Sequence, residues 1–143
     1  MATKSSIEQL NSFLRGEISA VETYQMALDK VDDISTARDE LLVNLKSHQD
    51  RVMMLQEAII AAGGTPATGS GPWGVFAKVV EGGAKALGKK AAIAALEEGE
   101  DHGLRDYKAD DELEPQTRML LETQLRPAQQ LTHDRLSALK HRM

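Results

Sequence analysis

The residues best suited to chemistry are carboxylates that lie on apolar helical stripes. Glu17 stands between Leu14 and Val21, with gaps of three and four residues, and Tyr24 follows seven residues after it. Because an α-helix turns about 100° per residue, Glu17 and Tyr24 lie within about 20° of each other and of the apolar stripe. A buried carboxylate is strongly destabilising unless a metal ion, a cation or a hydrogen-bond donor offsets its lost hydration. Glu17 is therefore predicted to face a partner.

A second stretch repeats this arrangement in the later half of the chain. Glu100 corresponds to Glu17 and Tyr107 to Tyr24, and a glycine precedes each glutamate. The repeat predicts two related halves, each of which places one carboxylate in the core. The tyrosine hydroxyls could orient these carboxylates, or the tyrosines could be core aromatics with one polar contact each.

Two histidines are candidate partners for the glutamates. With a turn near residue 33, Glu17 lies about as far before the turn as His48 lies after it, so the two share one height. With a turn near residue 113, Glu100 lies closer to the turn than His133 does. That mismatch amounts to about 10 Å of helix. Pro127 should kink or rotate the intervening helix, so Glu97, Glu122, Gln129 and Gln130 stay in reserve as partners from this half.

Four helices are predicted to position these residues, at about 6–31, 35–62, 90–111 and 115–141. The first begins at a capping box at Ser5 or Ser6, and Glu114 followed by Pro115 opens the last. The second carries an inward stripe made of Leu41, Leu45, His48, Val52, Leu55 and Ile59.

The connection at about 63–89 is too long for a simple hairpin turn. Its apolar residues recur at helical spacing from Trp73 to Leu87, which predicts a partly helical crossover that lies against the other helices. If much of it is helical, some 25 residues reach about 35 to 40 Å, the length of a bundle. The whole chain is therefore predicted to form one all-α domain, an antiparallel four-helix bundle with one long crossover.

Composition excludes several classes of function. The chain has 143 residues, 3% aromatic residues, no cysteine and a net charge of −5. The acidic balance argues against a nucleic-acid partner, and the lack of cysteine excludes disulfides and thiolate-bound metals. No apolar run approaches the ~20 residues of a membrane span, and no signal-peptide region opens the chain. A cytoplasmic location without membrane contact is the expectation.

Three motifs carry a resemblance to the ferritin-like superfamily. They are Leu14-Arg-Gly-Glu-Ile-Ser-Ala-Val-Glu-Thr-Tyr24, Gly71-Pro-Trp-Gly-Val-Phe76 and Ala95-Leu-Glu-Glu-Gly-Glu-Asp-His-Gly-Leu104. The glutamate and tyrosine spacing is similar to that of rubrerythrin. Over nearly the whole chain, the motifs resemble a family of small bacterial ferritin-like proteins, a domain family of unknown function. The resemblance implies a ferritin-like bundle.

The superfamily also implies two metal ions, held by one Glu on each of two helices and a Glu-x-x-His on each of the others. Glu17 and Glu100 match the single glutamates, and His48 and His133 match the histidines. Leucine and glutamine stand three residues before the two histidines, where the superfamily has glutamate. Two carboxylates and two imidazoles would suit a single ion of iron, manganese or zinc.

Three functions follow as hypotheses. The first is binding of a transition metal by Glu17, His48, Glu100 and His133, for which the superfamily implies a role in metal handling or oxidative stress. The second is a metal-free helical scaffold, in which a glutamate, histidine and tyrosine network is a relict that fixes register. The third, a two-iron oxidoreductase, requires Glu97 or Glu122 to supply a carboxylate; no catalytic residue is assigned. An exposed apolar strip on the crossover would favour a homodimer.

Overall fold

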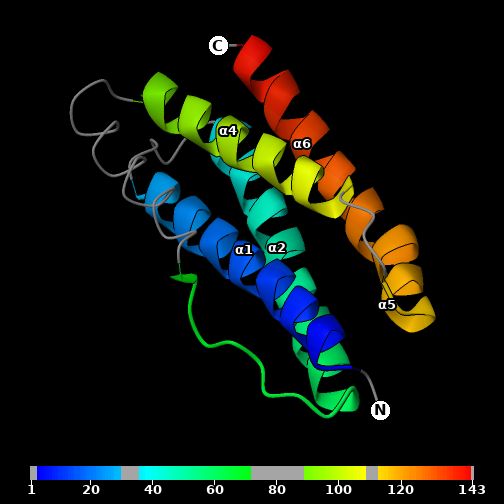
Figure 1. Ribbon diagram of the computed structural model, residues 1–143. Coiled ribbons are helices and arrows are strands. Elements are labelled where there is room, and N and C mark those ends of the chain that lie inside the picture. The colour runs from blue at the N-terminus through cyan, green and yellow to red at the C-terminus, as the bar shows by residue number, and fades with distance from the viewer. Residues whose placement is uncertain (1–2, 30–35, 72–88, 109–112, 143) are drawn as a thin grey trace.

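The computed structural model describes residues 3–29, 36–71, 89–108 and 113–142, and in these ranges the protein is all-helical. Four helical rods pack together (Figure 1). They are α1 (Lys4–Leu28), α2 (Thr36–Ala61), α4 (Lys89–Lys108), and a fourth rod made of α5 (Pro115–Leu120), η2 (Leu121–Leu125) and α6 (Arg126–His141). The predicted four-helix bundle is therefore confirmed. The predicted apolar face from Trp73 to Leu87 lies outside the described residues, which resume at residue 89.

The helix ends follow local capping chemistry. The predicted cap at Ser5 or Ser6 is wrong, because α1 begins at Lys4 and is capped by Thr3, whose hydroxyl accepts a 3.1 Å hydrogen bond from the backbone N–H of Ser6. Threonine caps well because its short side chain reaches a free N–H of the first turn. The predicted start of the last rod is confirmed, with Glu114 as the cap and Pro115 in the first turn.

The helices associate as two antiparallel pairs, α1 with α2 and α4 with α6. One apolar cluster lies at each end of the bundle. The first contains Tyr24, Leu28, Leu41, Ile93, Leu96 and Leu136, and the second contains Leu10, Phe13, Leu14, Leu55, Ile59 and Leu121. On each rod, buried polar residues lie between the part that packs in the first cluster and the part that packs in the second. The core thus has an apolar, polar, apolar order along its length.

The inward stripe of α2 differs from the predicted one at two positions. Asn44 and Arg51 are fully buried, whereas Leu45 and Val52 are only partly buried. α2 is rotated slightly away from the orientation that would bury the most apolar surface. The buried polar side chains instead form hydrogen bonds with residues of the other helices. This rotation brings Arg51 into the centre.

Pro127 shifts the phase of the fourth rod. Proline lacks a backbone N–H, and its ring crowds the carbonyl four residues earlier. The chain accommodates it through the π-helical turn η2, in which the N–H of Arg126 donates to the carbonyl of Leu121, five residues back. A π-turn inserts one extra residue into the helix. Leu121, Leu125 and then Gln129 therefore point inward.

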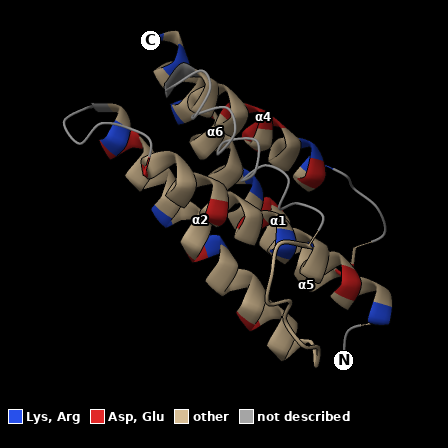
Figure 2. Cartoon of the chain, turned by 90° about the vertical axis from the view of Figure 1, so that its left-hand side faces the viewer, with Lys and Arg blue, Asp and Glu red and all other residues tan. Residues whose placement is uncertain are grey.

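The surface carries charge of both signs. Figure 2 shows basic and acidic residues interspersed along the helices. No helix in the described ranges has the length and apolarity needed to cross a membrane.

Candidate functional site: a buried ion network

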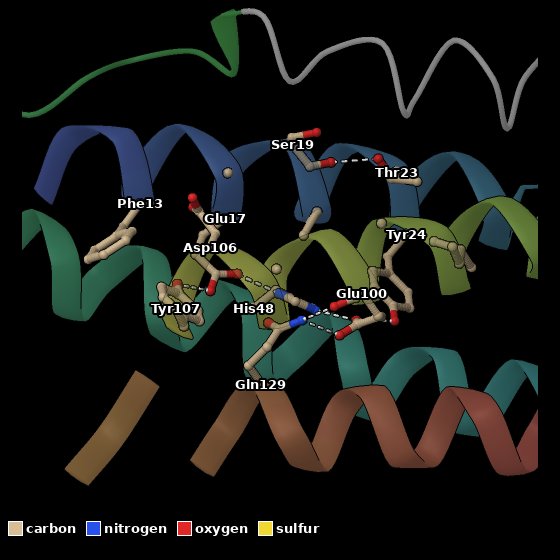
Figure 3. Close-up of a pocket in the computed structure, with 15 residues that line it drawn as sticks. Phe13, Glu17, Ser19, Thr23, Tyr24, His48, Glu100, Asp106, Tyr107 and Gln129 are labelled. Carbon is tan, nitrogen blue, oxygen red and sulfur yellow. Dashed lines mark hydrogen bonds and ion pairs between the residues drawn. The ribbon is translucent and has the colours of Figure 1, made fainter. Parts of the chain in front are cut away.

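Three of the four predicted metal-binding residues meet in the polar middle of the bundle (Figure 3). Glu17 comes from α1, His48 from α2 and Glu100 from α4, and each is at most 3% exposed. His48 Nδ1 lies 2.5 Å from Glu17 Oε1, and His48 Nε2 lies 2.7 Å from Glu100 Oε2. The imidazole ring thus bridges the two carboxylates and links the two halves of the chain.

The two carboxylate contacts favour an imidazolium at His48 when both glutamates are ionised; Arg51 Nη2 also lies 3.3 Å from His48 Nε2. Each ring nitrogen faces a carboxylate oxygen, and a neutral imidazole donates from only one nitrogen. Burial by itself lowers the pKa of His48, and the nearby Arg51 also lowers it. The charges of Glu100 and Glu17 outweigh both effects and raise the pKa above its ordinary value of 6.5.

Arg51 is a member of this network that was not predicted from the sequence. Its side chain is completely buried. Nη1 donates to Glu17 Oε2 at 3.1 Å and also to Gln129 Oε1, while Nη2 donates to Thr132 Oγ1 at 3.0 Å and to Ser47 Oγ at 3.2 Å. The signal in the sequence is its position three residues after His48, on the same helical face. A buried guanidinium supplies a permanent positive charge.

Glu100 receives hydrogen bonds on both oxygens. Oε2 accepts from the Tyr24 hydroxyl at 2.5 Å and from His48 Nε2 at 2.7 Å. Oε1 accepts from Gln129 Nε2 and from the Thr132 hydroxyl, both at 2.8 Å. Burial raises the pKa of Glu100, but the charge of His48, the hydrogen bonds from His48 and Tyr24 and the charge of Arg51 lower it below 4.5. A carboxylate offers roughly four lone-pair sites, and all of them are used here.

Glu17 is held as an anion in the same way. Besides the contacts with His48 and Arg51, its Oε2 accepts a hydrogen bond from the Tyr107 hydroxyl. Burial raises the pKa of Glu17, but the charges of Arg51 and His48 and the hydrogen bonds from His48 and Tyr107 lower it to about 2. The carboxylate is therefore ionised at neutral pH.

The two tyrosines orient carboxylates across the repeat. Tyr24 from the first half donates to Glu100 of the second, and Tyr107 from the second half donates to Glu17 of the first. Burial and the facing carboxylates raise the pKa of both tyrosines well above 10. Both hydroxyls therefore stay neutral donors. Asn44 extends the network by donating to the Tyr24 hydroxyl at 3.0 Å.

The fourth predicted ligand, His133, lies outside this centre. Its Nε2 is 2.6 Å from Asp101 Oδ1 and its Nδ1 is 3.3 Å from Asp134 Oδ1, near the surface. Burial lowers the pKa of His133, but the hydrogen bonds to Asp134 and Asp101 and the charges of these carboxylates outweigh burial and raise the pKa above 6.5. Thr132 takes the inward place next to it.

Of the four alternative partners predicted from the second half of the chain, one lies in the centre and three lie near the surface. Gln129 lies in the centre. Glu97 pairs with Lys140 at 2.8 Å, Gln130 donates to the surface residue Asp134, and Glu122 is exposed. Neither Glu97 nor Glu122 therefore faces Glu17 or Glu100, which is the arrangement that a two-iron site would need.

A cavity of about 50 Å³ adjoins the network between α1 and α4. Small residues of the two helices line it, and Glu17, Glu100 and His48 form part of its wall. Gly16 faces open space, whereas a Cβ atom on Gly103 would stand 2.5 Å from Gln129 Nε2. The absence of a side chain at position 103 is thus what lets Gln129 reach Glu100.

The network is electrically balanced by protein groups. Glu17 and Glu100 carry two negative charges, and Arg51 and protonated His48 carry two positive charges. Among the described residues, every buried side-chain nitrogen and oxygen has a hydrogen-bond partner. The same residues contain no group of three or more histidine, aspartate and glutamate side chains arranged to hold a metal ion. The lone pairs that a metal would need already accept hydrogen bonds, so this arrangement does not fit one.

Comparisons with known proteins give no relatives: no family model, no curated protein and no solved structure matches this chain.

Proposed function

We propose that this protein is a ferritin-like helical scaffold, in which an internal ion network occupies the place where the superfamily's metal centre is expected, and that it acts through its surface. The observation that carries the proposal is the completely buried guanidinium of Arg51, 3.1 Å from Glu17. A fixed cation at this position supplies the charge that a metal ion would otherwise provide.

The hydrogen bonds that Glu100 and His48 already make also support the scaffold function. A bound transition metal would need free lone pairs on Glu17, Glu100 and His48. Glu100 accepts four hydrogen bonds, and His48 points both nitrogens at carboxylates. Metal binding would require His48 to lose a proton and several of these bonds to break, at a large cost in a buried site.

Transition-metal binding is the second candidate function. It is favoured by the convergence of Glu17, His48 and Glu100 from three helices, the set of ligand types that iron, manganese and zinc accept. In this alternative, Arg51 would have to withdraw from Glu17.

Metal analysis separates the two functions. The protein is purified without chelators, incubated with ferrous iron, manganese or zinc at neutral pH and desalted. Its metal content per chain is then measured by elemental mass spectrometry. The scaffold predicts no stoichiometric metal. One metal ion per chain that is lost in both Glu17→Ala and His48→Ala would establish the second function instead.

The His133→Ala variant is the matched control for this experiment. It removes the imidazole that pairs with Asp101 near the surface and leaves the centre intact. Metal that disappears in His133→Ala but persists in His48→Ala belongs to the surface and leaves the scaffold proposal standing.

A further inference from the structure

The outward side of α2 carries large apolar residues that the bundle leaves exposed. Leu42, Val43, Met53 and Ile60 are 42%, 49%, 58% and 64% exposed. Because Leu42, Met53 and Ile60 follow one another at whole numbers of helical turns, they fall within about 20° of one another on the helix. We call the stripe from Leu42 to Ile60 the outer stripe of α2.

The outer stripe runs along one side of α2 and mixes apolar and polar residues, since Lys46, Gln49 and Gln56 stand between Leu42, Met53 and Ile60. Its positions follow one another with gaps of four, three, four, three and four residues, at Leu42, Lys46, Gln49, Met53, Gln56 and Ile60. A repeat of about 3.5 residues keeps such a stripe facing a partner helix along its whole length. The opposite side of α2 faces the ion network, so this helix presents one stripe to the core and another outward.

The charges on the outer stripe select the direction of a partner helix. Lys46 lies toward the N-terminal end and Glu57 toward the C-terminal end, and both are exposed. In an antiparallel pair of identical helices, Lys46 of one copy faces Glu57 of the other when the two-fold axis passes between residues 51 and 52. The same axis places Met53 of the two copies next to each other. A parallel pair would instead set lysine against lysine and glutamate against glutamate.

We propose that two copies of this chain associate through the outer stripes of α2, antiparallel and related by a two-fold axis near Arg51 and Val52. The inference deepens the proposed function, because it names a second copy as the partner of the scaffold. The contact extends over about 27 Å of helix. A single pair of helices lies at the small end of stable interfaces, so the dimer should dissociate on dilution.

Charge exchange tests the pairing. Sedimentation equilibrium of the full chain should show a monomer and dimer equilibrium. Lys46→Glu should weaken the dimer roughly tenfold, since it makes two symmetry-related pairs repulsive. Lys46→Glu combined with Glu57→Lys should restore it. Circular dichroism checks that each variant is folded, because Lys46 also pairs with Asp50 within its own helix.

Met119→Lys is the matched control, since Met119 is 66% exposed and belongs to α5, not to α2. It should leave the dimer unchanged. The proposal is overturned by a monomer at every concentration, by a double variant that fails to restore association, or by dissociation in Met119→Lys.

Spin labels test the direction of the pair. The chain has no cysteine, so Met53→Cys and Leu42→Cys each provide a single labelling site. In the antiparallel dimer, labels at position 53 lie close together near the axis, while labels at position 42 are separated by about 28 Å along the helices. Short distances at both positions would overturn the antiparallel arrangement. None of these outcomes depends on whether metal is bound, so they are independent of the proposed function's own test.

Discussion

Arg51 and His48 are three residues apart on α2, and both contact carboxylates from α1 or α4. Two buried anions opposed by two buried cations form a set whose members depend on one another. Removing one member leaves a buried charge without its partner, whereas the intact set is neutral. The stability of the protein should therefore respond more strongly to single substitutions here than to any surface ion pair.

The first prediction concerns pH. The pKa of His48 is raised above 6.5, so its contribution to stability is complete below pH 6.5 and is lost as the pH rises through the raised value. The pKa of Glu17 is lowered from 4.5 to about 2, so its contribution is complete above pH 4.5 and is lost as the pH falls toward 2. Urea unfolding across this range should give the greatest stability between these limits.

Two variants test whether His48 causes the loss of stability above pH 6.5. His48→Gln should flatten the loss of stability above pH 6.5, while His133→Ala should remove only a small part of it, because His133 is partly exposed. Stability that increases above pH 6.5 in the wild type would contradict protonation of His48.

The second prediction is that Arg51→Met destabilises the protein by about 3 to 5 kcal/mol, because it leaves Glu17 without its nearest fixed cation. Glu17→Gln should also cost several kcal/mol. In chemical unfolding, the double variant should lose less than the sum of the two single variants, since it removes both charges together.

Lys140→Met provides the comparison on the surface. Lys140 is exposed and pairs with Glu97 at 2.8 Å, so its replacement should change stability far less than Arg51→Met does. Equal losses in Arg51→Met and Lys140→Met would show that burial of the cation has no energetic effect.

The sequence predicted that Glu17 and His48 share one height, from their equal distance to a turn, and that Glu100 faces the core, from the repeat and helical phase. It did not predict Arg51. Arginine is normally a surface residue, and its place on the inward face becomes apparent only when the partners that neutralise it are known. The place of His133 could not be predicted for a different reason, since Pro127 interrupts the phase of its helix.

At the scale of elements, close packing of α4 against α6 positions the hydrogen bonds of Glu100. Gly103 of α4 leaves the space through which Gln129 of α6 reaches the carboxylate, and η2 gives Gln129 its inward phase. The start of the last rod could be predicted because Pro115 is a local signal, while the predicted helix ends at residues 31 and 111 lie outside the described residues. The π-helical turn could not be predicted, because it depends on how α6 packs as well as on Pro127.

The third prediction compares two glycines in helices. Gly16→Ala should stabilise the protein by about 1 kcal/mol, because alanine favours helix and a Cβ atom at position 16 meets no atom within 4 Å. Gly103→Ala should destabilise it by about 1 to 3 kcal/mol, because Gln129 must give up its bonds to Glu100. Thermal unfolding of both variants measures the difference. Equal stabilisation by the two substitutions would show that Gln129 moves aside freely.

At the scale of the whole molecule, the ion network joins the two helix pairs. Tyr24 to Glu100, Tyr107 to Glu17 and Arg51 to Gln129 all cross from one pair to the other. The repeat in the sequence predicted this two-part organisation. The antiparallel pairing of α1 with α2 and of α4 with α6 is also as predicted from the short turns. The exchange of partners between the halves was not predicted, because it depends on how the pairs dock.

The fourth prediction is that metals and chelators leave the melting temperature unchanged. A ligand that binds only the folded state stabilises it in proportion to the logarithm of its concentration over its dissociation constant. Excess zinc, manganese or ferrous iron, or removal of metals by a chelator, should therefore give no shift in differential scanning calorimetry. A rise with one metal that is abolished in Glu17→Ala would contradict the metal-free scaffold.

The most direct measurement of the central claim is the protonation of His48, followed by ¹⁵N NMR of imidazole-labelled protein. The His48 signal is assigned by comparison with His48→Gln, since the chain has four histidines. The ion network predicts that both ring nitrogens carry protons at pH 6.5 and that they titrate only above that pH. A neutral ring with one unprotonated nitrogen at pH 6.5, whether free or bound to a metal, would contradict it.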